Sequence, residues 1–170
     1  DVFLSLRNLS MILLYRPSKN KIIWKSKSNY FFNQHDVNIL DSNRISIFDN
    51  NMKFYHDRMA VDGNNRMVIY DFRTDEYSYY MTGSLQKEDV RTIQEGRGQI
   101  LPNGDLYIEE SNYGRILYFN ADGTLRWVNI NRGKNGPLSM VNWSRILYKK
   151  KDIKNLNMFL NNKTKDSIYD

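Results

Sequence analysis

Short apolar stretches that alternate with turn residues recur along this chain, and their recurrence limits the fold more than any other feature. The clearest unit, RGQILPNGDLYIEESNYGRILYFNADGTLRWVNI, runs from residue 97 to residue 130. It predicts four strands joined by turns at Pro102-Asn103-Gly104, Asn112-Tyr113-Gly114 and Ala121-Asp122-Gly123. Asn-Gly and Asp-Gly between alternating apolar runs are strong signals for a β-hairpin. We therefore expect consecutive antiparallel strands here.

A second unit aligns with the first. VNILDSNRISIFDN at residues 37–50 matches GQILPNGDLYIEES at residues 98–111. RMVIYDFRTDEYSYY at residues 66–80 matches RILYFNADGTLRWVN at residues 115–129. The earlier unit carries an insertion, NMKFYHDRMAVDGNN at residues 51–65, between its second and third strands. The chain is therefore built, at least in part, from a repeated four-stranded unit.

Two shorter stretches repeat part of the same pattern. LLYRPSKNKIIWK, residues 13–25, repeats the third and fourth strands, and SRILYKK, residues 144–150, resembles the start of another third strand. Four antiparallel strands per unit at a period of about 40–50 residues is typical of a β-propeller. We therefore predict an all-β fold of about three propeller blades. A meandering antiparallel sheet or a sandwich is the alternative.

The predicted blades are fewer than the roughly four to eight that close a propeller ring. We expect sequence before Asp1 to complete the ring, since Asp1 enters in the middle of a blade. A second copy of the chain, in a homo-oligomer, or an open assembly is the alternative. The expected propeller portion covers residues 1–148. A basic tail, residues 149–170, breaks the strand rhythm and favours a short helix around Ile153 to Leu160.

Composition limits the chemistry that this chain can perform. It has no cysteine, which excludes disulfides, zinc–thiolate sites and thiol nucleophiles. Its two histidines, His35 and His56, lie apart in the sequence, so we expect no metal and no other cofactor. The net charge of +6 is scattered except at Lys149–Lys151, and no aromatic RNA-binding motif is present. We expect no nucleic-acid partner. No apolar run approaches the roughly 18 residues of a membrane span.

The segments LSLRNLSMILLYRPSKNKIIWK and QHDVNILDSNRISIFDNN together resemble the arylsulfotransferase (arylsulfate sulfotransferase) family. That family has an S-x-R strand, an I-x-W strand, then Q-H-D and a strand closing on F-D-N. The unit from residue 98 to residue 129 is similar to its following blade, and the resemblance spans nearly all of residues 1–148. It implies a six-bladed propeller with a funnel-shaped active site on its axis. Members transfer a sulfo group from a phenolic sulfate ester to a phenol, without a nucleotide sulfate donor.

The same resemblance implies roles for individual residues. His35, in Q-H-D, corresponds to the nucleophile, and Arg7, in S-x-R, corresponds to the group that grips the sulfo oxygens. Gln34 and Arg97 are further candidates for substrate binding. A neutral imidazole is a competent nucleophile because its unperturbed pKa is about 6.5. Attack on sulfur would give a sulfohistidine and predicts ping-pong kinetics.

Three of these residues also have a structural interpretation. His35 can be a strand-end residue, Arg7 can pair with a neighbouring carboxylate, and Arg97 can be a turn arginine between two glycines. For the whole chain, the alternative is a noncatalytic propeller that serves binding or assembly, because propellers host many functions. The resemblance further implies small-molecule aryl sulfate and phenol partners, a periplasmic or secreted location, and additional histidines that would precede Asp1.

Overall fold

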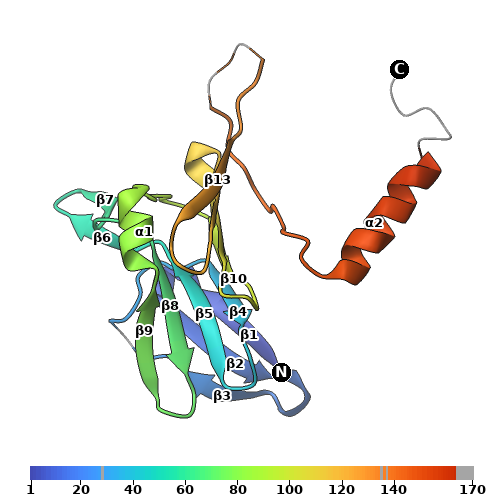
Figure 1. The fold of residues 1–170 in the computed structure, drawn as a ribbon. Coiled ribbons are helices and arrows are strands. Elements are labelled where there is room, and N and C mark those ends of the chain that lie inside the picture. The colour runs from blue at the N-terminus through green and yellow to red at the C-terminus, as the bar shows by residue number, and fades with distance from the viewer. Residues whose placement is uncertain (28, 135, 137, 164–170) are drawn as a thin grey trace.

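The computed structural model describes residues 1–27, 29–134, 136 and 138–163. In these residues the chain forms three successive antiparallel sheets, a small separate hairpin, and α-helices after the second and third sheets (Figure 1). The fold is therefore nearly all-β with antiparallel sheets, as predicted.

The first sheet has three strands and the other two have four each. The first contains, in spatial order, β1 (Val2–Leu6), β2 (Met11–Arg16) and β3 (Lys21–Lys25). The second contains β4 (Asp36–Ile39), β5 (Arg44–Asp49), β8 (Arg66–Asp71) and β9 (Glu76–Tyr80). The third contains β10 (Arg97–Ile100), β11 (Leu106–Glu110), β12 (Arg115–Phe119) and β13 (Leu125–Ile130). Three 3-10 helices lie between strands: η1 (Arg7–Leu9), η2 (Pro17–Lys19) and η3 (Ser111–Tyr113).

The aligned sequence units correspond to equivalent sheets. Residues 37–50 and 98–111 form the first two strands of the second and third sheets, and the 51–65 insertion forms the hairpin of β6 (Met52–Tyr55) and β7 (Arg58–Val61). The third-and-fourth-strand repeat at residues 13–25 is β2 and β3. The register of β2 with β3 and of β12 with β13 shifts at the same place, directly after the pair that contains Trp24 or Trp127. The three sheets are therefore variants of one unit.

The turns follow from local side-chain and backbone chemistry. Between β4 and β5, the Asp41 carboxylate accepts the N–H groups of Asn43 and Arg44 at 2.8 and 2.9 Å. The side chain thus supplies hydrogen-bond acceptors for backbone N–H groups in the turn, next to the paired strands. Gly104 and Gly123 occupy the left-handed region, with φ of 85° and 83°, in two of the three turns that join the strands of the third sheet. A glycine adopts this conformation without the steric cost of a Cβ atom.

The strand predicted at residues 144–150 is wrong. Residues 144–148 have no regular structure, and α2 (Lys150–Lys163) begins directly after them. A strand needs a neighbour to pair its backbone groups, and no described strand pairs with this segment. The Ser144 N–H donates instead to the Glu109 carboxylate at 2.5 Å.

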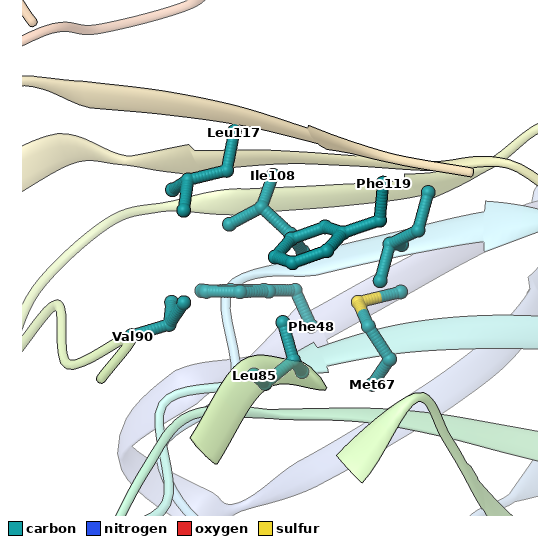
Figure 2. Packing of buried hydrophobic residues seen from close by; sticks show 8 residues of the cluster. Phe48, Met67, Leu85, Val90, Ile108, Leu117 and Phe119 are labelled. Atoms are coloured by element: carbon teal, nitrogen blue, oxygen red, sulfur yellow. The ribbon is translucent and has the colours of Figure 1, made fainter. Parts of the chain in front are cut away.

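Apolar cores fill the spaces between successive sheets. Between the second and third sheets, Phe48 and Met67 face Ile108 and Phe119, and Leu85 of α1 (Thr82–Lys87) packs beside them (Figure 2). The sequence patterns above do not predict α1. A second core joins the first and second sheets and is formed by Ile12, Phe31, Ile45, Ile47, Val68 and Tyr70. Each sheet thus buries its apolar side chains against the next.

Helix α2 lies apart from the three sheets in Figure 1. It covers the tail segment in which a short helix was expected and is longer at both ends. No helix in the described part of the chain is both long enough and apolar enough to cross a membrane.

Candidate active site

The first strands of the second and third sheets meet around a small pocket. His35 directly precedes β4, and Arg97 begins β10. The two strands are joined by a hydrogen bond from Asn38 Nδ2 to the Gly98 carbonyl oxygen, at 3.1 Å. The pocket has a volume of about 150 Å³, and besides His35 and Arg97 its lining includes Asp36, Glu95, Glu109 and Trp143. Four separate parts of the sequence therefore contribute to one site.

The strand register brings the Q-H-D and F-D-N motifs together. Asp36 pairs with Phe48 across β4 and β5, and the His35 N–H donates to the Phe48 carbonyl oxygen at 3.1 Å. Asn50 follows two residues later and places its Oδ1 atom 2.7 Å from His35 Nδ1. Two short motifs separated by a hairpin turn therefore form one hydrogen-bonded pair.

The hydrogen bonds of Asn50 fix the tautomer of His35. The Asn50 side chain is fully buried. Its Nδ2 atom donates to the carbonyl oxygens of Thr92 and Glu95, at 3.1 and 2.8 Å. Its Oδ1 is therefore an acceptor, so His35 Nδ1 carries the proton and Nε2 keeps its lone pair. The Glu95 N–H donates to this Nε2 at 3.1 Å.

The surroundings of His35 favour the uncharged imidazole. Burial is the main cause that lowers the pKa of His35 below its ordinary value of 6.5. The hydrogen bond with Asn50 opposes this by raising the pKa, and the positive charge of Arg7 lowers it further. His35 is consequently neutral near pH 7, as a nitrogen nucleophile has to be.

Arg97 is the cation that lines the pocket. Its Nε atom lies 3.7 Å from Asp36 Oδ2, and its Nη1 atom donates to the Ser144 carbonyl oxygen at 3.2 Å. The guanidinium lies over the Trp143 ring, 5.0 Å from the ring centroid. Burial raises the pKa of Asp36, while its hydrogen bond from Asn38 and the charge of Arg97 lower it. Arg97 is thus held in place by contacts from the second sheet and from the segment after β13.

Arg7 lies in η1, directly after β1, and is not among the residues that line the pocket. Its Nη2 atom lies 3.4 Å from the Ile93 carbonyl oxygen, and its Nη1 atom donates to Asn8 Oδ1 at 3.1 Å. Its Nε atom is buried and has no hydrogen-bond partner among the described residues. Arg7 therefore acts on His35 through its positive charge, which lowers the pKa of His35, and not as a residue that lines the pocket.

Gln34 is fully buried and also lies outside the pocket lining. Its Nε2 atom donates to the Met11 carbonyl oxygen at 2.9 Å and to Ser5 Oγ at 3.2 Å. These contacts tie the segment before β4 to the first sheet. Gln34 therefore helps to hold the chain at His35.

Sequence reasoning missed Asn50 and Glu109. Asn50 closes the F-D-N motif, so its place in the motif was the available signal. Glu109 is buried, and its carboxylate accepts hydrogen bonds from Ser111 Oγ at 3.0 Å and from the Trp143 N–H at 3.1 Å. Two consecutive glutamates, Glu109 and Glu110, at the end of an apolar strand were the available signal for this role. Glu109 holds the segment that carries Trp143 against the pocket.

The described residues contain no group of three or more histidine, aspartate or glutamate side chains arranged to hold a metal ion. The ionisable groups of the pocket are one imidazole, one guanidinium and three carboxylates, those of Asp36, Glu95 and Glu109. The imidazole can supply a nitrogen nucleophile, and the Arg97 guanidinium is the group that can contact an anion.

No curated protein and no solved structure matches the chain significantly. A family model described as "Arylsulfotransferase (ASST)" matches residues 1–132, which contain all three sheets, His35 and Asn50. The match covers well over half of the sequence and includes the two motifs joined by the His35–Asn50 hydrogen bond, and the chain belongs to the arylsulfotransferase family.

Proposed function

We propose that this chain transfers a sulfo group from a phenolic sulfate ester to a phenol, with His35 as the nucleophile. The observation that carries the proposal is the tautomer of His35. Its Nδ1 atom is committed to Asn50 Oδ1, so the lone pair is on Nε2 in a residue that lines the pocket. Burial lowers the pKa of His35, which keeps this lone pair free of a proton near pH 7.

In the first step, the Nε2 lone pair attacks the sulfur atom of the donor. The nitrogen–sulfur bond forms as the bond between sulfur and the phenolic oxygen breaks, and the electron pair leaves on the phenolate. The ring is then positively charged and carries the negative sulfo group. The Nδ1–H still donates to Asn50 Oδ1, which stabilises the positive ring.

In the second step, an acceptor phenolate attacks the sulfur atom and returns the electron pair to Nε2. The acceptor proton passes to solvent, and the first phenolate takes up a proton there. Donor and acceptor react in separate steps, which gives ping-pong kinetics. The enzyme returns to the neutral His35 with which it started.

Positive charge near the sulfo oxygens supports this chemistry. Sulfo transfer should resemble phosphoryl transfer, in which charge in the transition state spreads over the peripheral oxygens. A guanidinium stabilises such charge by directed hydrogen bonds. Arg97 lines the pocket and is our candidate for this role. What supports a contribution from Arg7 is its charge, which lowers the pKa of His35.

The Glu95 N–H favours a second candidate function. It donates to the same Nε2 lone pair that would attack sulfur, at 3.1 Å. Attack requires this hydrogen bond to open. If it stays closed in the presence of donor, the chain is a noncatalytic binding or assembly module built on the same scaffold.

The face-to-face packing of successive sheets supports a propeller arrangement, in which further blades or another copy of the chain would close the ring. The family supports small-molecule aryl sulfates and phenols as substrates. We further propose a periplasmic or secreted location from the family resemblance alone.

The test is incubation of the chain with 4-nitrophenyl sulfate, followed by mass spectrometry of peptides kept near neutral pH. We expect one sulfo group on His35 and release of nitrophenol, with transfer to phenol when it is added. His35→Asn should abolish both, and His56→Asn, in the turn of the β6–β7 hairpin, should change neither. Unchanged transfer by His35→Asn, in a protein that remains folded, would refute the assignment. A folded wild-type chain without an adduct would favour the binding module.

A further inference from the structure

A second and larger pocket lies at the end of the third sheet. Its volume is about 500 Å³, and it shares no lining residue with the His35 pocket. Three of its side chains are arginines, Arg91, Arg115 and Arg132, and two are carboxylates, Asp89 and Glu110. Three guanidinium groups against two carboxylates leave one net positive charge. The proposed sulfo transfer does not use this pocket.

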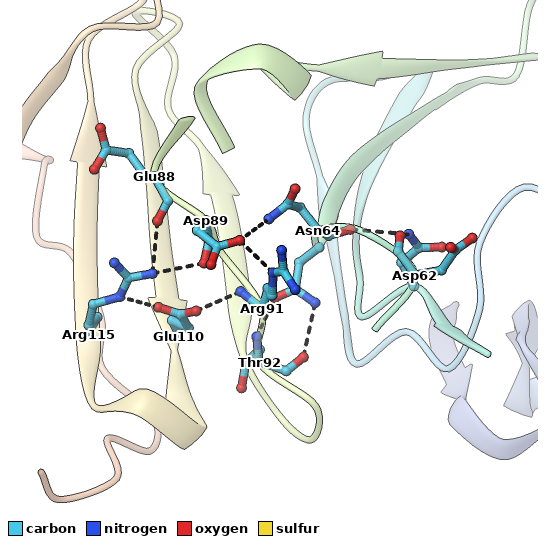
Figure 3. Close-up of polar contacts among 10 residues, drawn as sticks. Asp62, Asn64, Glu88, Asp89, Arg91, Thr92, Glu110 and Arg115 are labelled. Atoms are coloured by element: carbon cyan, nitrogen blue, oxygen red, sulfur yellow. Dashed lines mark hydrogen bonds and ion pairs between the residues drawn. The ribbon is translucent and has the colours of Figure 1, made fainter. Parts of the chain in front are cut away.

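Both carboxylates are paired with arginines of the same pocket. Glu110 is fully buried, accepts the Arg91 backbone N–H at 2.6 Å, and pairs with Arg115 Nε. Asp89 Oδ1 accepts from Asn64 Nδ2 at 2.9 Å and from Arg91 Nε at 2.5 Å (Figure 3). This network fixes the loop before β10 against β11 and β12. Both oxygens of Glu110 are thus engaged within the network, and Asp89 is paired with Arg91 through its Oδ1 atom.

The arginines, by contrast, keep donors for a ligand. Arg115 Nη2 donates to the Glu88 and Asp89 carbonyl oxygens, at 3.0 and 3.2 Å, which holds its guanidinium in a fixed orientation. For Arg91, the side-chain contact is made by Nε, so its two terminal nitrogens remain. In the described part of the chain, no residue forms a hydrogen bond or ion pair with the Arg132 guanidinium. A guanidinium with free donors suits an anion that presents two oxygens side by side, as carboxylates, sulfonates and sulfate esters do.

The remaining wall of the pocket is apolar and exposed. Tyr113, Ile130 and Leu138 line it and are 44%, 43% and 47% exposed. An apolar group placed against these side chains would remove apolar surface from water, which is favourable. The pocket therefore combines anion donors on one part of its lining with apolar surface on another.

We propose that this pocket binds a small organic anion, with a carboxylate, sulfonate or sulfate ester group on a flat apolar body. The anionic group would contact Arg132 and the free edges of Arg91 and Arg115. The apolar body would lie against Ile130 and Leu138. This binding site goes beyond the proposed sulfo transfer and does not depend on the chemistry of His35.

The pocket is joined to the His35 site by one loop. Arg91 lies in the larger pocket, and Glu95, four residues later, donates its N–H to His35 Nε2. The Thr92 carbonyl oxygen between them accepts from Asn50. A ligand in the larger pocket should therefore first change the conformation of residues 91–95.

The test is an NMR titration of the ¹⁵N-labelled chain with benzenesulfonate. We expect amide shifts at Ile130, Arg132 and Leu138 that saturate together. Arg132→Gln should weaken this binding about fivefold or more, since it removes one charged donor. Arg132 is chosen because its loss leaves no buried carboxylate without a partner. Lys134→Gln, a charge change on the same loop outside the pocket lining, should leave the affinity unchanged.

Two further ligands separate the contribution of the anionic group to the affinity from that of the apolar body. Benzyl alcohol, which lacks the charge, and inorganic sulfate, which lacks the apolar body, should each bind more weakly than benzenesulfonate. An unchanged affinity in Arg132→Gln, or sulfate binding as tightly as benzenesulfonate, would overturn the proposal. Shifts confined to the His35 pocket would overturn it as well. His35→Asn should retain the binding, so failure of the sulfo-transfer proposal and failure of this one are distinguishable.

Discussion

Replacement of Asn50 by alanine tests the reasoning about the His35 tautomer most directly. Asn50 makes three hydrogen bonds from a fully buried position, to His35 Nδ1 and to the carbonyl oxygens of Thr92 and Glu95. The Thr92 oxygen keeps a donor, Asn65 Nδ2, at 3.0 Å. The Glu95 oxygen and His35 Nδ1 lose the partner that Asn50 supplies.

The magnitude follows from these contacts. A hydrogen bond contributes a net free energy of about 1 kcal/mol, and a buried polar group left without a partner costs about 1–3 kcal/mol. Loss of three hydrogen bonds at a buried site therefore lowers the free energy of unfolding of Asn50→Ala by about 3 kcal/mol. The Nδ1–H tautomer of His35 also loses its acceptor, so the population of the other tautomer should rise.

Urea unfolding gives the free energy, and ¹⁵N chemical shifts of the imidazole give the tautomer. Asn129→Ala is a matched control, because Asn129 is exposed on β13, and its effect should stay within about 0.5 kcal/mol. A loss below about 1 kcal/mol in Asn50→Ala, with an unchanged denaturant slope, would refute the energetic reasoning. An unchanged tautomer would refute the assignment of Asn50 as the residue that positions His35.

Two further predictions concern pH and backbone conformation. Burial holds the pKa of folded His35 below its ordinary value of 6.5. Between these two pKa values the unfolded chain binds more protons than the folded chain, so the free energy of unfolding falls as the pH drops below about 6.5. Unfolding curves between about pH 7.5 and about pH 5.5 should show a shallower fall in His35→Asn, and an equal fall would contradict the assigned direction of the shift. Gly96 has a φ of 87°, and an added Cβ would lie 2.6 Å from the Phe48 ring. Gly96→Ala should therefore cost about 2 kcal/mol or more. Gly83 lies in α1 with open space around it, so Gly83→Ala should stabilise the protein by about 0.5 kcal/mol. Equal changes in thermal stability for Gly96→Ala and Gly83→Ala would contradict this account.

Much of the fold was readable from sequence because its signals are local. The Asn-Gly and Asp-Gly turns predicted the strands of the third sheet, and the alternating apolar runs that align with that unit predicted the strands of the second. These signals act within a few residues. The same reasoning failed at residues 144–150, where the apolar pattern was present but no partner strand was. It also missed α1, a short helix held by burial of Leu85 between two sheets.

The sequence by itself determined the repeat, the order of strands and turns, and the two motifs that include His35 and Asn50. Only the tertiary structure decided that Asn50 holds the imidazole, that Glu95 meets its Nε2 atom, and that Gln34 and Arg7 lie outside the pocket lining. The physical reason is that tautomer, burial and charge at a side chain are set by groups distant in sequence. The alternation of apolar and polar residues in a strand does not show which backbone N–H of a distant loop, here that of Glu95, will bond to a side chain next to that strand.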